Sequence, residues 1–260
     1  SPVAGLSSLI PQYYSAAASA ERLMELRQLP QEAPPAAPLR FESFTALELH
    51  GVRFSYGGAD VLSNVEMTVR KGDIAALTGI SGGGKSTLFR LILGAYKPQS
   101  GAVIIRAGAE ERSPGCDSRG LFAYVPQGNC LFSGTLRENI AFATLADDET
   151  VMNAARTACA EEFIRQLPDG LDTLIGENGA GLSEGQAQRI AVARAVCSGA
   201  DFLLLDEATS ALDAETESRL LKNISALDGK TVLIVTHRPA ALEICSRKFT
   251  LKDGVVDEWI

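Results

Sequence analysis

Residues 79–86, GISGGGKS, have the composition and spacing of a loop that binds phosphate. They fit the pattern G-x-x-x-x-G-K-[ST] between a predicted strand at 74–79 and a predicted helix at 85–93. Glycines let backbone N–H groups approach phosphate oxygens, and the helix N-terminus adds the positive end of its dipole. The alternative is a glycine-rich turn that precedes Lys and Ser by chance. The residues expected to bind nucleotide here are Gly79, Ser81, Gly82, Gly83, Gly84, Lys85, Ser86 and Thr87.

Two side chains of this loop have distinct chemical tasks. The Lys85 ammonium would reach the β- and γ-phosphates, and the Ser86 hydroxyl would bind Mg²⁺. These features predict a nucleotide-binding protein. They do not by themselves distinguish kinases, GTPases, motors and transporters.

Two adjacent acids follow a buried strand at 202–206, which reads FLLLD. The carboxyl end of such a strand is where α/β sheets place their ligands. Neighbouring side chains on a strand point to opposite faces, so the two carboxylates have different roles. We expect Asp206 to hold Mg²⁺ and Glu207 to orient and polarise the attacking water. An acidic strand end that caps the next helix is the alternative, and the phosphate loop favours the catalytic interpretation.

Two further strand ends carry candidate site residues. His237 follows the apolar run TVLIVT and would reach the same sheet edge, where it could contact a γ-phosphate. Gln127 follows FAYV, and its amide could contact both the metal and the water. A packing histidine and an ordinary turn glutamine are the respective alternatives. The other histidine, His50, is interpreted as a packing or surface residue.

A second glycine-containing turn opens a helix at 182–186, LSEGQ. Ser183 is a good N-cap, and Gln186 follows it at the spacing of a capping box. A capped helix end alone accounts for this spacing.

Several predicted strands are near-continuous apolar runs, which is typical of a parallel sheet covered on both faces. An α/β core is therefore expected, with the early β-rich part as a separate antiparallel layer. Strands are predicted at 47–54, 65–70, 74–79, 103–106, 122–125, 202–206 and 231–236, and helices at 85–93, about 149–166, 184–198 and 214–226.

Composition limits the remaining possibilities. The chain has 260 residues, of which 46% are hydrophobic, enough for one sizeable domain or one domain with an appendage. A net charge of -8 argues against a protein that mainly binds nucleic acid. The five cysteines show no C-x-x-C spacing and are interpreted as reduced thiols in a cytosolic compartment. No apolar stretch approaches the roughly 20 residues of a membrane span, so the chain itself is expected to be soluble.

The first part of the chain differs from the rest. Residues 6–29 approximate helical apolar spacing, and 30–39 contain four prolines, which favours an extended linker. We therefore expect an N-terminal extension at 1–44 and the main domain at 45–260.

In their order, these motifs resemble the nucleotide-binding domain of ATP-binding cassette (ABC) transporters. The resemblance covers essentially all of 45–260 and includes the phosphate loop, YVPQ, LSEGQ, FLLLDE, SALD at 210–213 and VTHR. It implies a RecA-like P-loop core with an antiparallel β subdomain and an inserted α-helical subdomain at about 129–200. It also implies ATP and Mg²⁺ as cofactors. Tyr56 resembles the aromatic residue that stacks on adenine, and its alternative is a strand or turn tyrosine.

The resemblance also implies a second nucleotide-binding domain, in an identical or a different chain. Ser183, Gly185 and Gln186 would then contact the ATP that the partner's phosphate loop holds. Asp213 resembles the acidic member of a loop that connects the two ATP sites; its alternative is a helix cap. The usual signature is LSGGQ, and Glu184 here replaces the first glycine. We expect the Glu184 carboxylate to face away from the nucleotide, since it would repel a triphosphate.

Two segments are similar to exporters in particular: 133–142, SGTLRENIAF, and 175–186, in which Glu177 would contact cytoplasmic loops of a membrane domain. Residues 1–44 look like the end of a transmembrane domain followed by its linker; a helix that packs on its own domain is the alternative. The implied function is ATP-driven export at the cytoplasmic face of the plasma (inner) membrane, with a transmembrane domain and no nucleic acid as partner. A free-standing importer ATPase is the alternative. A cassette that acts on DNA or translation would need a basic surface and either a coiled-coil insertion or a second cassette.

Overall fold

The computed structural model describes residues 2–29, 32, 44–128, 130–227 and 229–259. The chain divides into two compact units, Ser1–Pro35 and Ala36–Ile260. The first contains the helix α1 (Pro2–Gln28), whose side chains from Leu9 onward are exposed. The predicted linker and the boundary before residue 45 lie almost entirely outside the described residues. Among the described residues, no helix is both long enough and apolar enough to cross a bilayer.

The second unit is organised around a six-stranded sheet in the order β12-β11-β3-β10-β9-β6. Its strands from β11 to β6 pair in parallel, and β12 adds to β11 as an antiparallel edge. Two adjacent interior strands, β9 and β10, are buried along their whole length, as their apolar sequences predict. The strand bounds are β3 (Ile74–Thr78), β6 (Phe122–Val125), β9 (Phe202–Asp206), β10 (Thr231–Val235), β11 (Arg247–Lys252) and β12 (Val255–Trp259).

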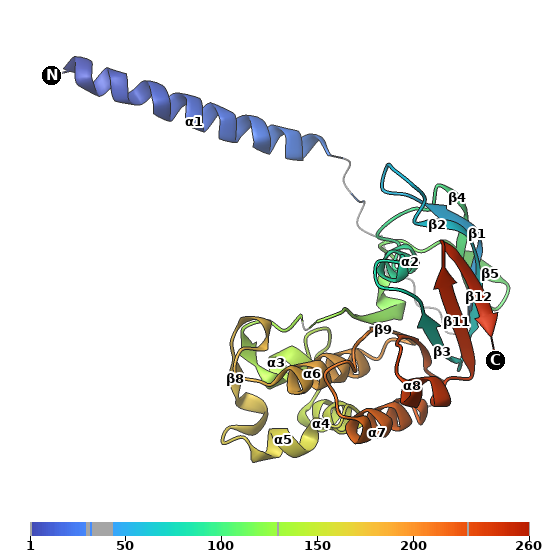
Figure 1. The fold of residues 1–260 in the computed structure, drawn as a ribbon. Coiled ribbons are helices and arrows are strands. Elements are labelled where there is room, and N and C mark those ends of the chain that lie inside the picture. Colours follow the sequence, from blue (N-terminus) through green and yellow to red (C-terminus); the bar gives the residue numbers. More distant parts are fainter. Residues whose placement is uncertain (1, 30–31, 33–43, 129, 228, 260) are drawn as a thin grey trace. The chain divides into compact units, whose positions relative to one another are not determined.

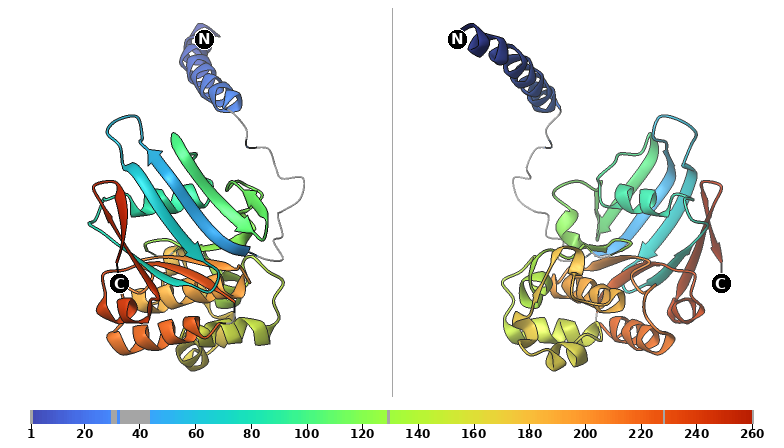
Figure 2. Two further views of the ribbon diagram at one scale, coloured as in Figure 1. Left: turned by 90° about the vertical axis from the view of Figure 1, so that its right-hand side faces the viewer. Right: turned by 60° about the vertical axis from the view of Figure 1, so that its left-hand side comes forward.

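An antiparallel sheet forms a separate layer, as predicted. Its order is β2-β1-β4-β5, with β1 (Phe44–Phe54), β2 (Leu62–Arg70), β4 (Ser100–Ala107) and β5 (Glu110–Arg112). The helix α2 (Lys85–Ile92) shares one apolar core with this layer and with one face of the parallel sheet. Figure 2 shows the antiparallel strands as a curved layer beside α2.

The other face of the parallel sheet is covered by α6 (Glu184–Cys197), α7 (Ala214–Ser225) and α8 (Pro239–Ile244). Shorter elements extend from there: β7 (Gly134–Thr135), α3 (Leu136–Ile140), α4 (Asp148–Thr157), α5 (Glu161–Gln166) and β8 (Leu174–Ile175). Three short 3-10 turns lie at Arg119–Leu121, Gly170–Asp172 and Glu177–Gly179. In Figure 1 this helical region and the antiparallel layer occupy opposite ends of the second unit.

One segment that was predicted as a single helix forms two helices in the structure. The sequence predicted a continuous helix at about 149–166, but α4 ends at Thr157 and α5 begins at Glu161. Cys159 between them has a left-handed backbone with φ of 57°, which a regular right-handed helix excludes. Its carbonyl accepts a 2.7 Å hydrogen bond from the Arg189 guanidinium on α6 instead of from a helical amide. Because Ala158 and Ala160 are both buried, the apolar pattern runs across the break and conceals it.

The surroundings of the surface residue His50 predict how the stability of the fold depends on pH. His50 is half exposed, and its ring nitrogens lie 3.1 Å from a Glu48 oxygen and 3.3 Å from a Glu66 oxygen. The hydrogen bond to Glu48, with that to Glu66, raises the pKa of His50 above its usual value. A raised folded-state pKa means that the stabilisation is complete below the unfolded pKa and is lost as pH rises through the folded one. At such an exposed site we expect protonated His50 to add no more than about 1 kcal/mol to the free energy of unfolding.

NMR titration of the His50 ring in the folded and the urea-unfolded chain measures this difference directly. Replacing His50 by Gln should reduce the free energy of unfolding near pH 6 but not near pH 9, since the imidazole is neutral there. A folded pKa at or below the unfolded one would contradict the expectation.

Candidate nucleotide site

The phosphate loop has a backbone that only glycine accommodates at two of its positions. Gly79 has φ of 144°, and a Cβ added there would clash with the carbonyl of Leu251. Gly84 is the N-cap of α2 with φ of 102°, and a Cβ there would lie 3.0 Å from a Val61 methyl. The loop therefore connects the buried strand β3 to the N-terminus of α2, in the context predicted for it.

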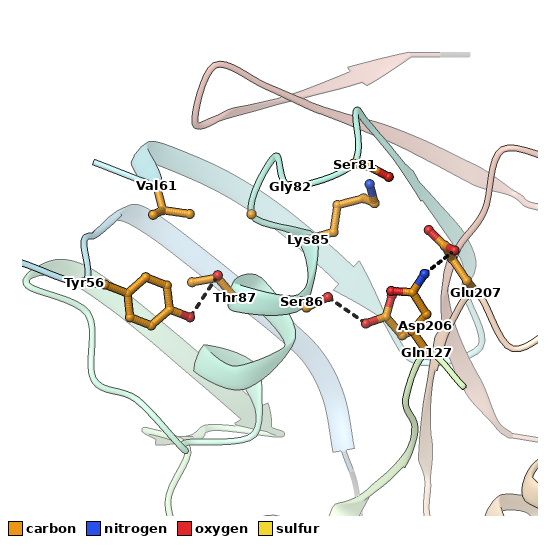
Figure 3. A pocket seen from close by; sticks show the side chains of 11 residues that line it. Tyr56, Val61, Ser81, Gly82, Lys85, Ser86, Thr87, Gln127, Asp206 and Glu207 are labelled. Carbon is orange, nitrogen blue, oxygen red and sulfur yellow. Dashed lines mark hydrogen bonds between the residues drawn. The ribbon is translucent and has the colours of Figure 1, made fainter. Parts of the chain in front are cut away.

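The two reactive side chains of the loop face different partners. The Lys85 ammonium is buried and donates to the backbone carbonyls of Gly79 at 2.6 Å and Ile80 at 2.9 Å. The Ser86 hydroxyl donates to Oδ2 of Asp206 at 2.9 Å. The phosphate loop and the end of β9 thus meet through the predicted serine and aspartate (Figure 3).

The adjacent carboxylates do have separate partners, as their alternation along the strand predicts. Whereas Asp206 faces Ser86, Glu207 accepts a hydrogen bond of 2.9 Å from Nε2 of Gln127. Glu207 has φ of 53°, a left-handed backbone that is costly for a glutamate, and its N–H donates to the Val235 carbonyl at 3.2 Å. Strain of this kind persists only where surrounding contacts impose it, which is common at functional sites.

Tyr124 is a further residue of the site that no sequence pattern predicted. Its hydroxyl donates to the same Asp206 oxygen at 3.3 Å. Burial, together with the neighbouring Asp206 carboxylate, raises the pKa of Tyr124 to about 12, so the phenol stays protonated and can donate. The position of Tyr124 follows from the pairing of β6 with β9, which places it opposite Leu204. No local motif in the sequence indicates that pairing.

A pocket of about 230 Å³ brings together most of the predicted nucleotide and metal residues. Its lining consists of Tyr56, Val61, Ser81, Gly82, Gly84, Lys85, Ser86, Thr87, Gln127, Asp206 and Glu207. As Figure 3 shows, these residues come from the segment between β1 and β2, the loop after β3, the start of α2 and the ends of β6 and β9. A neighbouring pocket of about 260 Å³ also contains Ser81 and Glu207, together with the exposed His237. His237, the predicted γ-phosphate contact, therefore shares a pocket with Ser81 and Glu207 that Asp206 does not line.

Tyr56 lies at one end of the first pocket, and the residue is 54% exposed. Its hydroxyl is 3.1 Å from the Thr87 hydroxyl and accepts a 3.1 Å hydrogen bond from Arg90, both residues of α2. The rings of Phe54 and Tyr96 contact it edge-on at centroid distances of 5.0 and 5.6 Å. The supporting residues Arg90 and Tyr96 were not predicted. Thr87, which is expected to bind nucleotide, lines the same pocket and contacts the tyrosine through its hydroxyl.

The remaining candidates lie away from this pocket. Ser183 and Gln186 form the predicted capping box at the start of α6, with reciprocal bonds of 2.9 and 3.2 Å. Asp213 caps α7 by accepting from the Thr216 N–H at 2.9 Å. Glu184 is the exposed first residue of α6. Within the part of the chain that the structure describes, Ser183, Gly185, Gln186 and Asp213 line neither pocket.

A phosphate loop between β3 and α2, with an acidic strand end two strands away across β10, defines a P-loop nucleotide-binding protein. A family model described as "ABC transporter" matches residues 62–210. The chain is 35% identical over 256 residues to a probable ABC transporter ATP-binding/permease protein of Haemophilus influenzae, covering 97% of this chain and 46% of that protein. It is 37% identical over 260 residues to the ATP-dependent lipid A-core flippase of Desulfotalea psychrophila, covering 98% of this chain and 45% of that protein.

Among solved structures, a bacterial Atm1-family ABC exporter with ATP bound matches with a TM-score of 0.84 and 32% identity, over 96% of this chain and 44% of that one. The chain belongs to the ABC transporter family. The predicted ABC ATPase fold and ATP as the nucleotide are confirmed, and the exporter interpretation is favoured over the importer one. The chain spans less than half the length of these relatives.

Proposed function

We propose that this chain is the ATP-hydrolysing domain of an ABC exporter and powers the movement of a substrate across a membrane. The observation that carries the proposal is the pair of adjacent carboxylates with separate partners, Asp206 on Ser86 and Glu207 on Gln127, at the wall of one pocket. This arrangement provides one carboxylate for a metal and another for a water.

The donor set fits Mg²⁺, which prefers oxygen ligands and keeps several waters. The Ser86 hydroxyl, the Asp206 carboxylate and the Gln127 amide oxygen would hold the ion, which neutralises phosphate charge when bound. Lys85 and the loop amides would bind the phosphates, and Tyr56 would stack on the base. Glu207, oriented by Gln127, would accept hydrogen bonding from the attacking water, and His237 would contact the γ-phosphate.

A second nucleotide-binding domain would complete the site. Ser183, Gly185 and Gln186 lie at the N-terminus of α6, away from their own chain's pocket, and a helix N-terminus favours anions. Two chains arranged about a two-fold axis would each offer this end to the other's ATP. Asp213, on the neighbouring loop, would lie at the same interface, and Glu184 would face away from the nucleotide.

A transmembrane domain would be the other partner, at the cytoplasmic face of the inner membrane. The helical region exposes large apolar side chains at Phe142, Leu145 and Leu174, and α1 exposes several more, as surfaces that bind partners do. We place residues 1–44 as an extension from that domain and 45–260 as the ATPase domain, with its helical subdomain at about 129–200. The name of the Haemophilus relative includes both an ATP-binding and a permease function, which supports this division.

ATP turnover by the purified chain, measured over a range of chain concentrations, tests the proposal. We expect hydrolysis that requires Mg²⁺ and a rate per chain that rises with concentration, because each site needs two chains. Chelation with EDTA is the control. A chain that neither binds nor hydrolyses ATP at any concentration would contradict the proposal, and a rate per chain independent of concentration would contradict the shared site.

A further inference from the structure

The loop at 209–213 connects the end of β9, which carries Glu207, to the start of α7. Thr209 and Ser210 line the second pocket beside Glu207 and His237. Backbone hydrogen bonds of 3.1 Å, from Ser210 to Glu207 and from Leu212 to Thr209, fold the segment into tight turns. The loop is therefore next to the proposed hydrolysis site, and side chains from both sides of it hold it in place.

On one side, the loop is held by Arg238, the residue that follows His237. One guanidinium nitrogen donates to the Leu212 carbonyl at 2.7 Å, and the other donates to the Ser210 carbonyl at 2.8 Å. The first nitrogen also donates to Oε2 of Glu217 at 3.0 Å. A planar guanidinium can bind several acceptors in fixed directions, which a lysine ammonium on a flexible stem cannot reproduce.

The carboxylate of Glu217, on α7, is only 2% exposed and is satisfied at both oxygens. Its second oxygen accepts a 2.7 Å hydrogen bond from the Thr209 hydroxyl, at the beginning of the loop. A buried carboxylate needs such partners, since an unpaired charge in this position is strongly destabilising. Glu217 thereby fixes both Arg238 and the first residue of the loop.

On the other side, the loop is held by α6, the helix that begins with the capped Ser183. Gln188, 2% exposed, donates to the Ser210 hydroxyl at 2.9 Å and accepts from the Ala211 N–H at 3.0 Å. Gly185 allows the start of α6 to lie close to the loop, because a Cβ at this position would be only 2.9 Å from the Ala211 carbonyl oxygen. The N-terminal part of α6 thus packs directly on the loop.

The family resemblance already implies that the 209–213 loop connects two ATP sites. From these contacts we infer which residues this connection depends on: Gln188, Glu217 and Arg238 are positioning residues that hold the loop between two functional ends of one chain. One end is the chain's own hydrolysis site, at Glu207 and His237. The other is the N-terminus of α6, which the chain presents to its partner's ATP. The inference rests on the proposed function. It implies that loosening the loop leaves ATP binding by one chain intact but reduces turnover and the cooperativity between two sites.

The test compares Arg238→Lys and Gln188→Met with the unaltered chain. Arg238→Lys keeps a positive charge beside Glu217 but loses the planar guanidinium that donates to several acceptors. Gln188→Met keeps the side-chain volume but loses the hydrogen bonds to Ser210 and Ala211. We expect each to lower kcat about tenfold, to change KM and the Kd for ATP at high dilution less than about threefold, and to move the Hill coefficient towards 1. The double variant should be little slower than either single one, because both residues hold the same loop. Arg219→Lys, on the exposed face of α7 in an ion pair with Glu162, is the matched control.

Thermal unfolding of each variant shows whether the fold is retained. Unchanged kcat and Hill coefficient in both variants would overturn the inference, as would losses of kcat that only follow losses of stability and of ATP binding. Turnover by the unaltered chain, measured in the same assay, reports on the proposed function separately. A chain without any turnover would overturn both.

Discussion

Replacing Glu207 by Gln should slow ATP hydrolysis about 10²- to 10³-fold and leave ATP binding nearly unchanged. The amide cannot accept a proton from the water, but it has the shape of the carboxylate and its oxygen can still accept the Gln127 hydrogen bond of 2.9 Å. The left-handed backbone at position 207 is the same for both side chains, so the substitution adds no new backbone strain. Single-turnover hydrolysis and equilibrium ATP binding are the two measurements.

Glu149→Gln, the same chemical change on the exposed first turn of α4, is the matched control and should behave like the unaltered chain. Near-normal turnover in Glu207→Gln would exclude Glu207 as the residue that acts on the water. Parallel loss of ATP binding would show instead that Glu207 is needed to form the pocket.

Replacing Ser183 by Arg should reduce turnover about a hundredfold, while ATP binding by the dilute chain changes less than about twofold. The reason is geometric: Ser183 lines neither of the two pockets beside the phosphate loop of its own chain, within the described residues. In the proposed dimer the substitution removes a hydroxyl and places a bulky side chain where the partner's ATP would lie. ATP binding and turnover must therefore be measured at different chain concentrations.

A second capping box in the same chain separates helix capping from catalysis. Thr135 and Glu138 form one at the start of α3, just as Ser183 and Gln186 do on α6. Thr135→Ala and Ser183→Ala should each lower the free energy of unfolding by about 1 kcal/mol, but only Ser183→Ala should reduce turnover. Equal turnover in these two variants would assign Ser183 to helix capping alone.

Local sequence patterns predicted four of the five parallel strands described, β3, β6, β9 and β10, because burial on both faces requires apolar runs. FAYV and FLLLD correspond to β6 and β9 residue for residue. The hairpin of β11 and β12 was not predicted, although Asp253 and Gly254 at its turn, both with positive φ, are a strong hairpin signal in a sequence. The break at Cys159 could not be predicted, since it depends on a hydrogen bond from Arg189, 30 residues away.

The same distinction applies to the candidate site. The phosphate loop is contiguous, so its composition predicts its geometry. The bonds from Gln127 to Glu207 and from Tyr124 to Asp206 require β6 to lie beside β9, and the order of strands in a sheet is not written in any local segment. The contacts of Arg238 and Gln188 likewise join segments that are 21 to 28 residues apart.

The hydroxyl of Tyr56 is bound to Thr87 and Arg90 of α2, the helix whose N-terminus ends the phosphate loop. The aromatic ring and the loop are therefore tied to one helix, although β1 and the following turn supply the tyrosine. Any displacement of α2 would carry the ring and the loop together, with their separation kept constant. If ATP lies between them as proposed, α2 sets the distance between the site for the base and the site for the phosphates. Contacts to both parts of the nucleotide would then be gained or lost in the same movement.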